Sequence, residues 1–143
     1  MSDPQVLAKL QDLLSSQKVL KLATAGGQVS PWITSVYFTA ETPFGLLFTL
    51  EKRGRGTANL AANPKVAVAI DASNPFTVFA QGEGVARLLP DGERARVTGA
   101  LLAKIPEAKP LYEGELLLVT VDISSWHVTS FPDGWFPAKV LTR

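Results

Sequence analysis

Short apolar segments separated by turn residues recur along most of this chain, and this pattern constrains the fold more than any other feature. The segments are rich in Val, Ile, Thr and Phe, which favour β-strands. Gly26-Gly27, Thr42-Pro43 and Ser73-Asn74-Pro75 mark turns between them. The expected strands are Val19–Thr24, Val29–Thr39, Leu46–Thr49, Val66–Asp71, Phe76–Gln81, Val85–Leu89, Leu116–Asp122 and Trp126–Thr129. This succession predicts a small barrel of six or more antiparallel strands in the mainly β (α+β) class.

Two longer helices are expected beside the strands. Asp3-Pro4 provides a capping side chain and a proline at the first helical position. Apolar residues then follow at helical spacing up to about Ser16, namely Val6, Leu7, Leu10, Leu13 and Leu14. A second helix is predicted from about Glu93 to Lys104, and Pro106 and Pro110 end that helical stretch. The 143 residues suit one domain that spans residues 1–143.

Composition excludes several classes of function. The net charge is only +1, whereas a dedicated nucleic-acid binder usually presents a strongly basic face. The chain contains no cysteine, so thiolate chemistry and cysteine metal sites are excluded. Its N-terminal segment lacks the apolar core of a signal peptide, and no apolar run approaches the ~20 residues that cross a bilayer. We expect a soluble, cytoplasmic protein with neither nucleic acid nor membrane as a partner.

Side chains that could carry chemistry on their own are scarce. His127 is the only histidine, so it cannot form a metal cluster, and we predict no metal site. The acids Asp71, Glu83 and Asp122 are scattered beside strands without the paired spacing that acid–base catalysis requires. No catalytic residue is therefore assigned. If the protein is an enzyme, a bound cofactor is expected to supply the reactive group.

A basic loop between two strands is the clearest candidate binding site. The strand Leu46–Thr49 leads into Lys52, Arg53 and Arg55, and a short helix is expected over Thr57–Ala62. Cations and unpaired backbone N–H groups at a helix N-terminus suit a phosphate, because the helix dipole also favours an anion there. Arginine can hold a phosphate with two parallel hydrogen bonds. The alternative interpretation is a solvated loop whose glycines provide flexibility.

The order of several short motifs resembles the pyridoxamine 5′-phosphate oxidase-like flavoproteins. The motifs lie within Val19–Leu89, and they are Leu22-Ala23-Thr24 before a glycine turn, Val29-Ser30-Pro31, Phe48-Thr49 with the basic loop, the run from Asn59 to Ala67, and Glu83-Gly84-Val85-Ala86. The resemblance implies a split β-barrel that binds FMN at a homodimer interface, where both subunits touch the cofactor.

The resemblance also implies a set of cofactor-binding residues. They are Ile33, Thr34, Ser35 and Val36 at the ring edge, Phe48 and Thr49 near the ring and ribityl chain, Lys52, Arg53, Arg55 and Thr57 at the phosphate, Gln81 on the strand contributed by the partner subunit, and Trp126 beside the flavin.

Two departures from the family pattern affect the expected function. Glycines occupy the serine and lysine positions of the usual phosphate loop, which here runs from Arg53 to Thr57. The C-terminal arginine–histidine pattern that grips the substrate phosphate of the true oxidase is absent, so pyridoxamine phosphate oxidation is not expected. The leading hypothesis is a homodimeric FMN-dependent oxidoreductase of unknown substrate. The alternative is a non-catalytic module that binds or carries a flavin, F420 or haem.

Overall fold

The computed structural model describes residues 3–26, 31–72, 74 and 76–143. Its helices are α1 (Pro4–Ser16), α2 (Arg55–Ala62) and α3 (Arg94–Lys104), with 3-10 segments η1 (Asp91–Glu93) and η2 (Pro106–Glu113). Its strands are β1 (Val19–Thr24), β2 (Trp32–Thr42), β3 (Gly45–Glu51), β4 (Lys65–Asp71), β5 (Val78–Leu88), β6 (Leu116–Ser130) and β7 (Trp135–Thr142).

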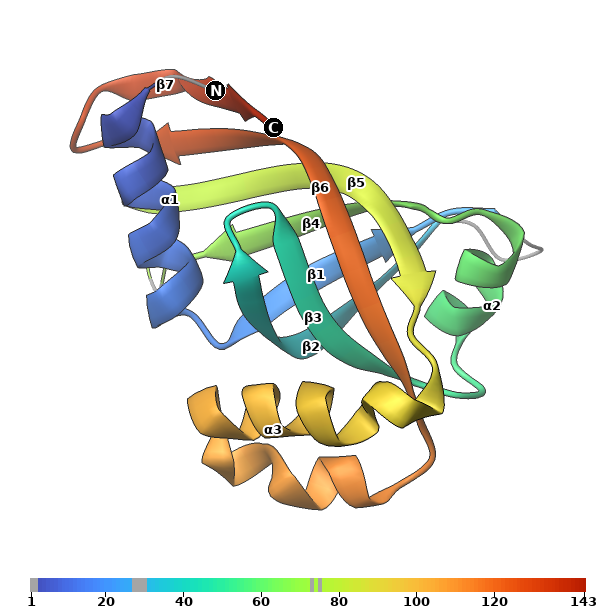
Figure 1. The fold of residues 1–143 in the computed structure, drawn as a ribbon. Coiled ribbons are helices and arrows are strands. Elements are labelled where there is room, and N and C mark those ends of the chain that lie inside the picture. Colours follow the sequence, from blue (N-terminus) through green and yellow to red (C-terminus); the bar gives the residue numbers. More distant parts are fainter. Residues whose placement is uncertain (1–2, 27–30, 73, 75) are drawn as a thin grey trace.

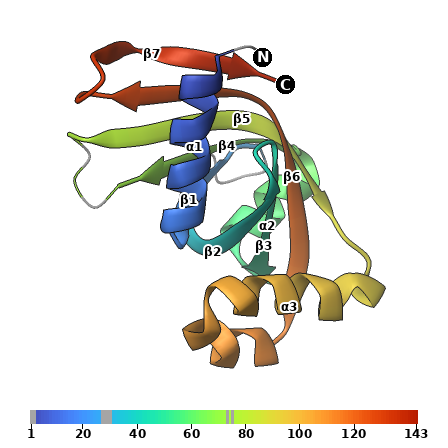
Figure 2. The same ribbon diagram turned by 60° about the vertical axis from the view of Figure 1, so that its left-hand side comes forward.

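The strands form an antiparallel barrel with one additional strand. Their order in the sheet is β3-β2-β1-β4-β5-β6-β7, and a further pairing of β3 with β6 closes the first six strands into a barrel. β7 extends the sheet beyond the barrel as a hairpin with β6. Figures 1 and 2 show α1 and α2 on opposite sides of this barrel and α3 beneath it. The expected six-stranded, mainly β fold is therefore confirmed.

The barrel is split between β2 and β3. The two strands pair only from Phe38 to Thr42 on β2, which faces Gly45 to Phe48 on β3. The first half of β2, Trp32–Tyr37, pairs with β1 alone, and the end of β3, Thr49–Glu51, pairs with β6 alone. No described strand fills the gap between these two edges. Because an unpaired strand edge presents backbone N–H and C=O groups, the split is a place where a ligand can form hydrogen bonds.

The barrel interior is a packed apolar core. Its largest fully buried side chains include Trp126, Phe38 and Phe48. Helix α1 covers one end of this core with Val6, Leu10, Leu13 and Leu14. This placement agrees with the apolar stripe expected for the helix, whose N-terminus is capped by the Asp3 carboxylate as predicted. A smaller cluster outside the barrel joins α3 to β3 and β6, and consists of Leu47, Val97, Leu101 and Leu118.

Several expected boundaries were wrong. The predicted strands Phe76–Gln81 and Val85–Leu89 form one strand, β5, whose pairing with β6 shifts register between Glu83 and Gly84. The two strands predicted between Leu116 and Thr129 are likewise one strand, β6.

Three further elements differ from the expectation. The helix expected from Thr57 begins at Arg55. The prolines Pro106 and Pro110 do not end all helical structure, because both lie in η2. β7 was not predicted. Part of the strand expected at Val29–Thr39, and of the turns at Gly26-Gly27 and Ser73-Asn74-Pro75, lies outside the described residues.

None of the helices among the described residues has both the length and the apolar character required to cross a bilayer.

Candidate functional site

The split between β2 and β3 contains two adjoining cavities, which we call the split groove. The larger has a volume of about 400 Å³ and the smaller about 200 Å³. Thr34, Leu50 and Glu51 line both, so the two cavities form one elongated depression. The larger is lined in addition by Val19, Ser35, Val36, Tyr37, Thr49, Leu111 and Leu116, and the smaller by Trp32, Gly54, Arg55, Gly56 and Thr57.

The larger cavity combines apolar walls with a strand edge. Thr34 and Val36 lie opposite buried Leu22 and Leu20 of β1, so their side chains share the core-facing side of the sheet. The backbone N–H of Phe38 bonds to Lys18 on the β1 side. Since alternate residues of a strand direct their backbone groups to opposite edges, those of Ser35 point toward the split. This cavity can therefore hold a flat molecule that offers polar atoms along one edge.

The side chain of Ser35 points away from the split groove. Its Oγ accepts a hydrogen bond of 2.9 Å from Nζ of Lys21 on the outer face of the barrel. Ile33 also points outward, and 63% of its surface is exposed. Both residues can reach a ligand in the split groove through their backbone, which is the type of contact that the sequence predicts for this strand.

The smaller cavity lies at the N-terminus of α2. The N-cap residue is Gly54, which has no side chain to bond the first N–H groups of the helix. The guanidinium of Arg55 lies 4.8 Å from the ring centroid of Trp32, a cation–π contact that positions it beside the cavity. Thr57 Oγ1 donates a 2.6 Å hydrogen bond to the carbonyl oxygen of Glu51. Open N–H groups and an arginine together make this end suitable for an anion.

Helix α2 is fixed to the barrel by a buried polar contact. Asn59 is 2% exposed, and its Nδ2 donates a 3.1 Å hydrogen bond to Oγ1 of Thr24 on β1. Because a buried amide without a partner is costly, this contact specifies how the helix sits. The helix N-terminus is thereby held at the end of the split groove.

One carboxylate lies in the same groove. Glu51 is exposed and lines both cavities, so a negatively charged ligand must sit nearer to Arg55 than to this side chain. Beyond Tyr37 at the far end lies Tyr112 of η2, whose Oη is buried and has no hydrogen-bond partner among the described residues. Burial, with a smaller contribution from Tyr37, raises the pKa of Tyr112, so its hydroxyl stays protonated at neutral pH.

The structure brings six of the predicted site residues into the split groove. They are Thr34, Ser35, Val36, Thr49, Arg55 and Thr57. Lys52 is exposed and lines a different cavity, together with Arg87 and Leu88. Arg53 is exposed in the loop before α2 and lines neither cavity of the groove. Arg55 is thus the basic side chain of the predicted loop that the structure places at the groove.

Gln81 lies too far from the split groove to act within the same chain. Ser35 pairs with Lys21, Lys21 with Ala69, and Ala69 with Gln81. Three strand spacings correspond to about 14 Å along the sheet. Gln81 is exposed on the outer face, so it could reach such a groove only from a second copy of the chain.

Phe48 and Trp126 occupy the core instead of the groove surface. Both side chains are fully buried. Trp126 Nε1 donates a 2.7 Å hydrogen bond to the carbonyl oxygen of Pro43, and the ring packs on Gly82, where an added Cβ would lie 2.8 Å from it. Trp126 therefore has no exposed atom to offer a flavin, and the expectation that it lies beside the ring is corrected. Phe48 can support the groove only from beneath.

Sequence reasoning missed several residues that line the groove. Trp32 and Tyr37 flank the predicted segment 33–36 on the same strand, and Leu50 and Glu51 extend the predicted Phe48-Thr49 pair. Leu111 comes from η2, which is distant in the sequence and carries no motif. The adjoining residues could have been included by extending each strand to its end, whereas Leu111 had no local signal.

The described residues contain no cluster of side chains that could bind a metal ion. Among the residues that the structure describes, no three His, Cys, Asp or Glu side chains gather as metal ligands do. His127 pairs with Gln81 and lies on the part of β6 beyond Asp122, where the pairing with β3 ends. It is therefore far along this strand from Leu116, the β6 residue that lines the groove. The split groove thus offers shape, hydrogen bonds and positive charge, but no strongly reactive side chain.

Comparisons with known proteins indicate a family and a fold. A family model described as pyridoxamine 5′-phosphate oxidase matches residues 6–127. No curated protein matches the sequence. A haem binding protein from Mycobacterium smegmatis is similar in structure with a TM-score of 0.81 and 20% identity, over 99% of this chain and 60% of that chain.

Two further solved structures share the fold across most of both chains. HutZ, the haem storage protein from Vibrio cholerae, has a TM-score of 0.71 and 19% identity, and the match covers 86% of this chain and 92% of HutZ. An FAD-binding protein from Mesorhizobium loti has a TM-score of 0.67 and 16% identity, over 85% of this chain and 91% of that protein. Two of these three structures are thus described as haem proteins and one as an FAD-binding protein.

Proposed function

The chain belongs to the pyridoxamine 5′-phosphate oxidase family, and on this premise we propose that it is a homodimeric FMN-binding oxidoreductase. The flavin would lie in the split groove, with its ring system in the larger cavity and its phosphate at the N-terminus of α2. A bound flavin supplies hydride or single-electron transfer.

The observation that carries this proposal is the polarity of the split groove. Its larger end is mainly apolar and borders an unpaired strand edge, whereas its smaller end holds Arg55 and the uncapped N–H groups of α2. FMN has the same division, with a flat ring at one end and a phosphate at the other. The groove is therefore matched to the cofactor in both shape and charge.

Each predicted contact has a distinct role. The backbone of Ser35 would bond the polar edge of the ring, while Thr34 and Thr49 would border the ring and the ribityl chain. Arg55 would bind the phosphate, and its contact with Trp32 holds the guanidinium in place before the ligand arrives. A preorganised arginine loses less conformational entropy on binding.

A homodimer is proposed because Gln81 is remote and because the outer barrel face carries exposed apolar side chains among polar ones such as Lys21 and Glu83. Ile33, Ala67 and Val85 are exposed on this face, and the exposed fractions of Ile33 and Val85 are 63% and 47%. Exposed apolar side chains that gather on one face of a small protein can mark an interface. A second copy packed there could bring the partner subunit's Gln81 to the groove.

The second candidate is a non-catalytic binding module for haem. It is favoured by two proteins of similar structure, one a haem binding protein and the other a haem storage protein. Tyr37 lines the larger cavity and is the groove side chain best suited to ligate haem iron, because a tyrosine serves this role in some haem proteins. F420 would use the same cavity and the same phosphate contacts as FMN.

Purification and cofactor identification test the proposal. Protein purified without added cofactor should be yellow, and mass spectrometry of the molecule released by heat should give the mass of FMN. A Soret band with released haem would instead favour the second candidate. Colourless protein that binds neither FMN nor haem on titration would exclude both.

The phosphate contact can be tested with a matched pair of variants. Arg55→Ala should weaken FMN binding about 10- to 100-fold, because a charge-assisted hydrogen bond contributes about 1.5–3 kcal/mol. Arg87→Ala removes an exposed arginine of β5 outside the split groove and should leave the affinity within about twofold. Fluorescence titration measures both, and equal affinities would remove Arg55 from the site.

A further inference from the structure

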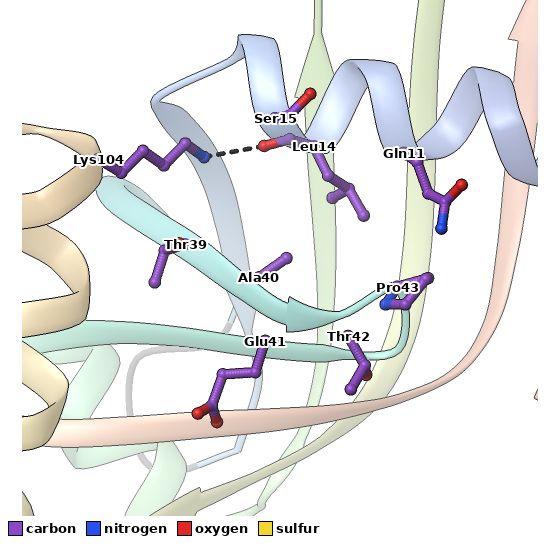
Figure 3. A pocket seen from close by; sticks show the side chains of 9 residues that line it. All are labelled: Gln11, Leu14, Ser15, Thr39, Ala40, Glu41, Thr42, Pro43 and Lys104. Carbon is purple, nitrogen blue, oxygen red and sulfur yellow. Dashed lines mark hydrogen bonds between the residues drawn. The ribbon is translucent and has the colours of Figure 1, made fainter.

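A separate cavity lies on the other side of the β2–β3 hairpin from the split groove. It has a volume of about 390 Å³ and lies between the end of α1, the turn of the hairpin and the last residue of α3 (Figure 3). Its lining residues are Gln11, Leu14, Ser15, Thr39, Ala40, Glu41, Thr42, Pro43 and Lys104. The cavity shares none of its lining with the split groove.

Lys104 is an unusual lining residue because it is a half-buried lysine without an ion pair among the described residues. Its side chain is half-buried and reaches from α3 to α1, where Nζ donates a 2.8 Å hydrogen bond to the carbonyl oxygen of Leu14. Nζ also lies 3.8 Å from the ring centroid of Phe38. Buried lysines are normally paired with carboxylates, yet Lys104 forms no ion pair within the described part of the chain.

The charged groups around Lys104 are already engaged with one another. Glu41, which lines the cavity, forms an ion pair with Arg96 of α3 at 2.5 Å. Glu107 of η2 pairs with Lys18 at 2.7 Å. The residues of α1 that line the cavity, Gln11, Leu14 and Ser15, are uncharged. Lys104 thus has a neutral carbonyl and a ring face as partners, and no counter-ion.

We propose that Lys104 is a nucleophilic lysine that forms a reversible imine with a small aldehyde or ketone bound in this cavity. Burial lowers the pKa of Lys104 to about 8, which agrees with a nucleophilic role for this amine. About one in four Lys104 side chains then carries the free amine at pH 7.5, against about one in a thousand for an ordinary lysine.

The chemistry needs no group beyond the amine and the carbonyl compound. The nitrogen lone pair attacks the carbonyl carbon, and a proton moves from nitrogen to the carbonyl oxygen to give a carbinolamine. Loss of water then leaves the C=N bond, and hydrolysis reverses the step. Thr39 lines the cavity and carries a hydroxyl that can hydrogen-bond the oxygen that becomes the leaving water, whereas Ser15 Oγ already donates to the carbonyl oxygen of Asp12. Leu14, Ala40 and Pro43 offer apolar contacts for a short alkyl or aryl group.

Competitive labelling within one protein tests this proposal. The chain has lysines at positions 9, 18, 21, 52, 65, 104, 109 and 139. Folded protein is treated at pH 7 with limiting propanal and sodium cyanoborohydride, which traps the imine as a secondary amine. Digestion with a protease that does not cut at lysine, followed by mass spectrometry, gives the labelling rate at each position. Lys104 should be labelled about tenfold or more faster than exposed Lys52.

Three comparisons make the result decisive. The preference should disappear in concentrated urea, because unfolding removes the burial of Lys104. It should shrink as the pH is raised toward 10, because the free-amine fraction of an ordinary lysine rises while that of Lys104 is already close to its maximum. An aldehyde carried on a large dextran, which cannot enter a cavity of about 390 Å³, should show no preference for Lys104. Labelling of Lys104 in folded protein at or below the rate of Lys52 overturns the nucleophilic role. An undiminished preference with the large aldehyde overturns the role of the cavity.

Discussion

Replacing Trp126 by phenylalanine should destabilise the fold and leave flavin binding almost unchanged. The side chain is fully buried, and its Nε1 bonds to the carbonyl of Pro43 at 2.7 Å. Phenylalanine lacks this donor, which costs about 1–2 kcal/mol for a partly solvated carbonyl. The smaller ring leaves a void that costs about another 1 kcal/mol. The total of about 2–3 kcal/mol corresponds to a urea midpoint lower by about 1–2 M.

Trp32→Phe is the matched control for this substitution. Trp32 is 37% exposed and lies against Arg55 at the small end of the split groove. The change should alter the free energy of unfolding by less than about 0.5 kcal/mol, but it should weaken FMN binding because Arg55 loses its support. Unfolding is followed by far-UV circular dichroism in urea, and binding by flavin fluorescence. If Trp126→Phe leaves the midpoint unchanged and reduces FMN affinity instead, the assignment of Trp126 to the core is refuted.

Three other perturbations follow from particular contacts. Gly84→Ala should lower the free energy of unfolding by more than about 3 kcal/mol in urea titrations, because a Cβ there would lie 2.2 Å from the carbonyl oxygen of Asp122; a change below about 1 kcal/mol would contradict this packing. Ala67→Arg on the outer face should yield a monomer with weakened FMN binding in light scattering and titration, whereas Ala103→Arg on α3 should remain dimeric. The folded-state pKa of Lys104, about 8, lies below the unfolded value, so the folded protein binds fewer protons than the unfolded protein between about pH 8 and 10.5. The free energy of unfolding of the wild type, compared with that of Lys104→Met, should therefore rise with pH through this range. Urea titrations should show a gain of about 1 kcal/mol after allowance for solvent screening.

The fold was predictable because its strands follow local rules. Alternating burial along β1 and β4 appears in the sequence as short runs of β-branched and apolar residues bounded by turns. The predicted break within β5 was wrong for a physical reason. Gly82 and Gly84 lie in the predicted break, but they are required where one continuous strand passes close to Trp126 and to the backbone of β6. A glycine that permits close packing is indistinguishable in the sequence from one that permits a turn.

β7 was missed because its residues do not alternate simply. Phe136 and Val140 are exposed, and Pro137 interrupts the run, as is tolerated on an edge strand. An edge strand needs to bury only one side against its neighbour. Its pattern is therefore weaker than that of a strand inside the barrel, and the sequence carries less information about it.

The candidate site was predictable where a motif coincides with a strand end, and not where contacts come from distant segments. Thr34, Thr49 and Arg55 lie on β2, β3 and α2, which border the split, and the resemblance of their motifs to the family was sufficient to group them. Trp126 was misplaced because the sequence does not state which face of β6 points inward. Its even-numbered neighbour Val128 is also fully buried, which shows that this face lines the core.

The scarcity of acidic and basic side chains in the split groove limits the mechanisms that it can support. Its lining offers hydroxyl groups, one arginine and a strand edge, and Glu51 is its only carboxylate among the described residues. His127 is eleven residues along β6 from Leu116, the residue of that strand that lines the groove. This separation corresponds to about 35 Å along the strand, so neither imidazole nor a pair of acids can act on a ligand held by one chain. Electron transfer through a bound flavin requires none of these groups, because the ring system itself accepts and releases the electrons. Under the proposed function the protein needs only to hold and orient the ring, and unpaired backbone at the edge of the split barrel would achieve this with few specialised side chains.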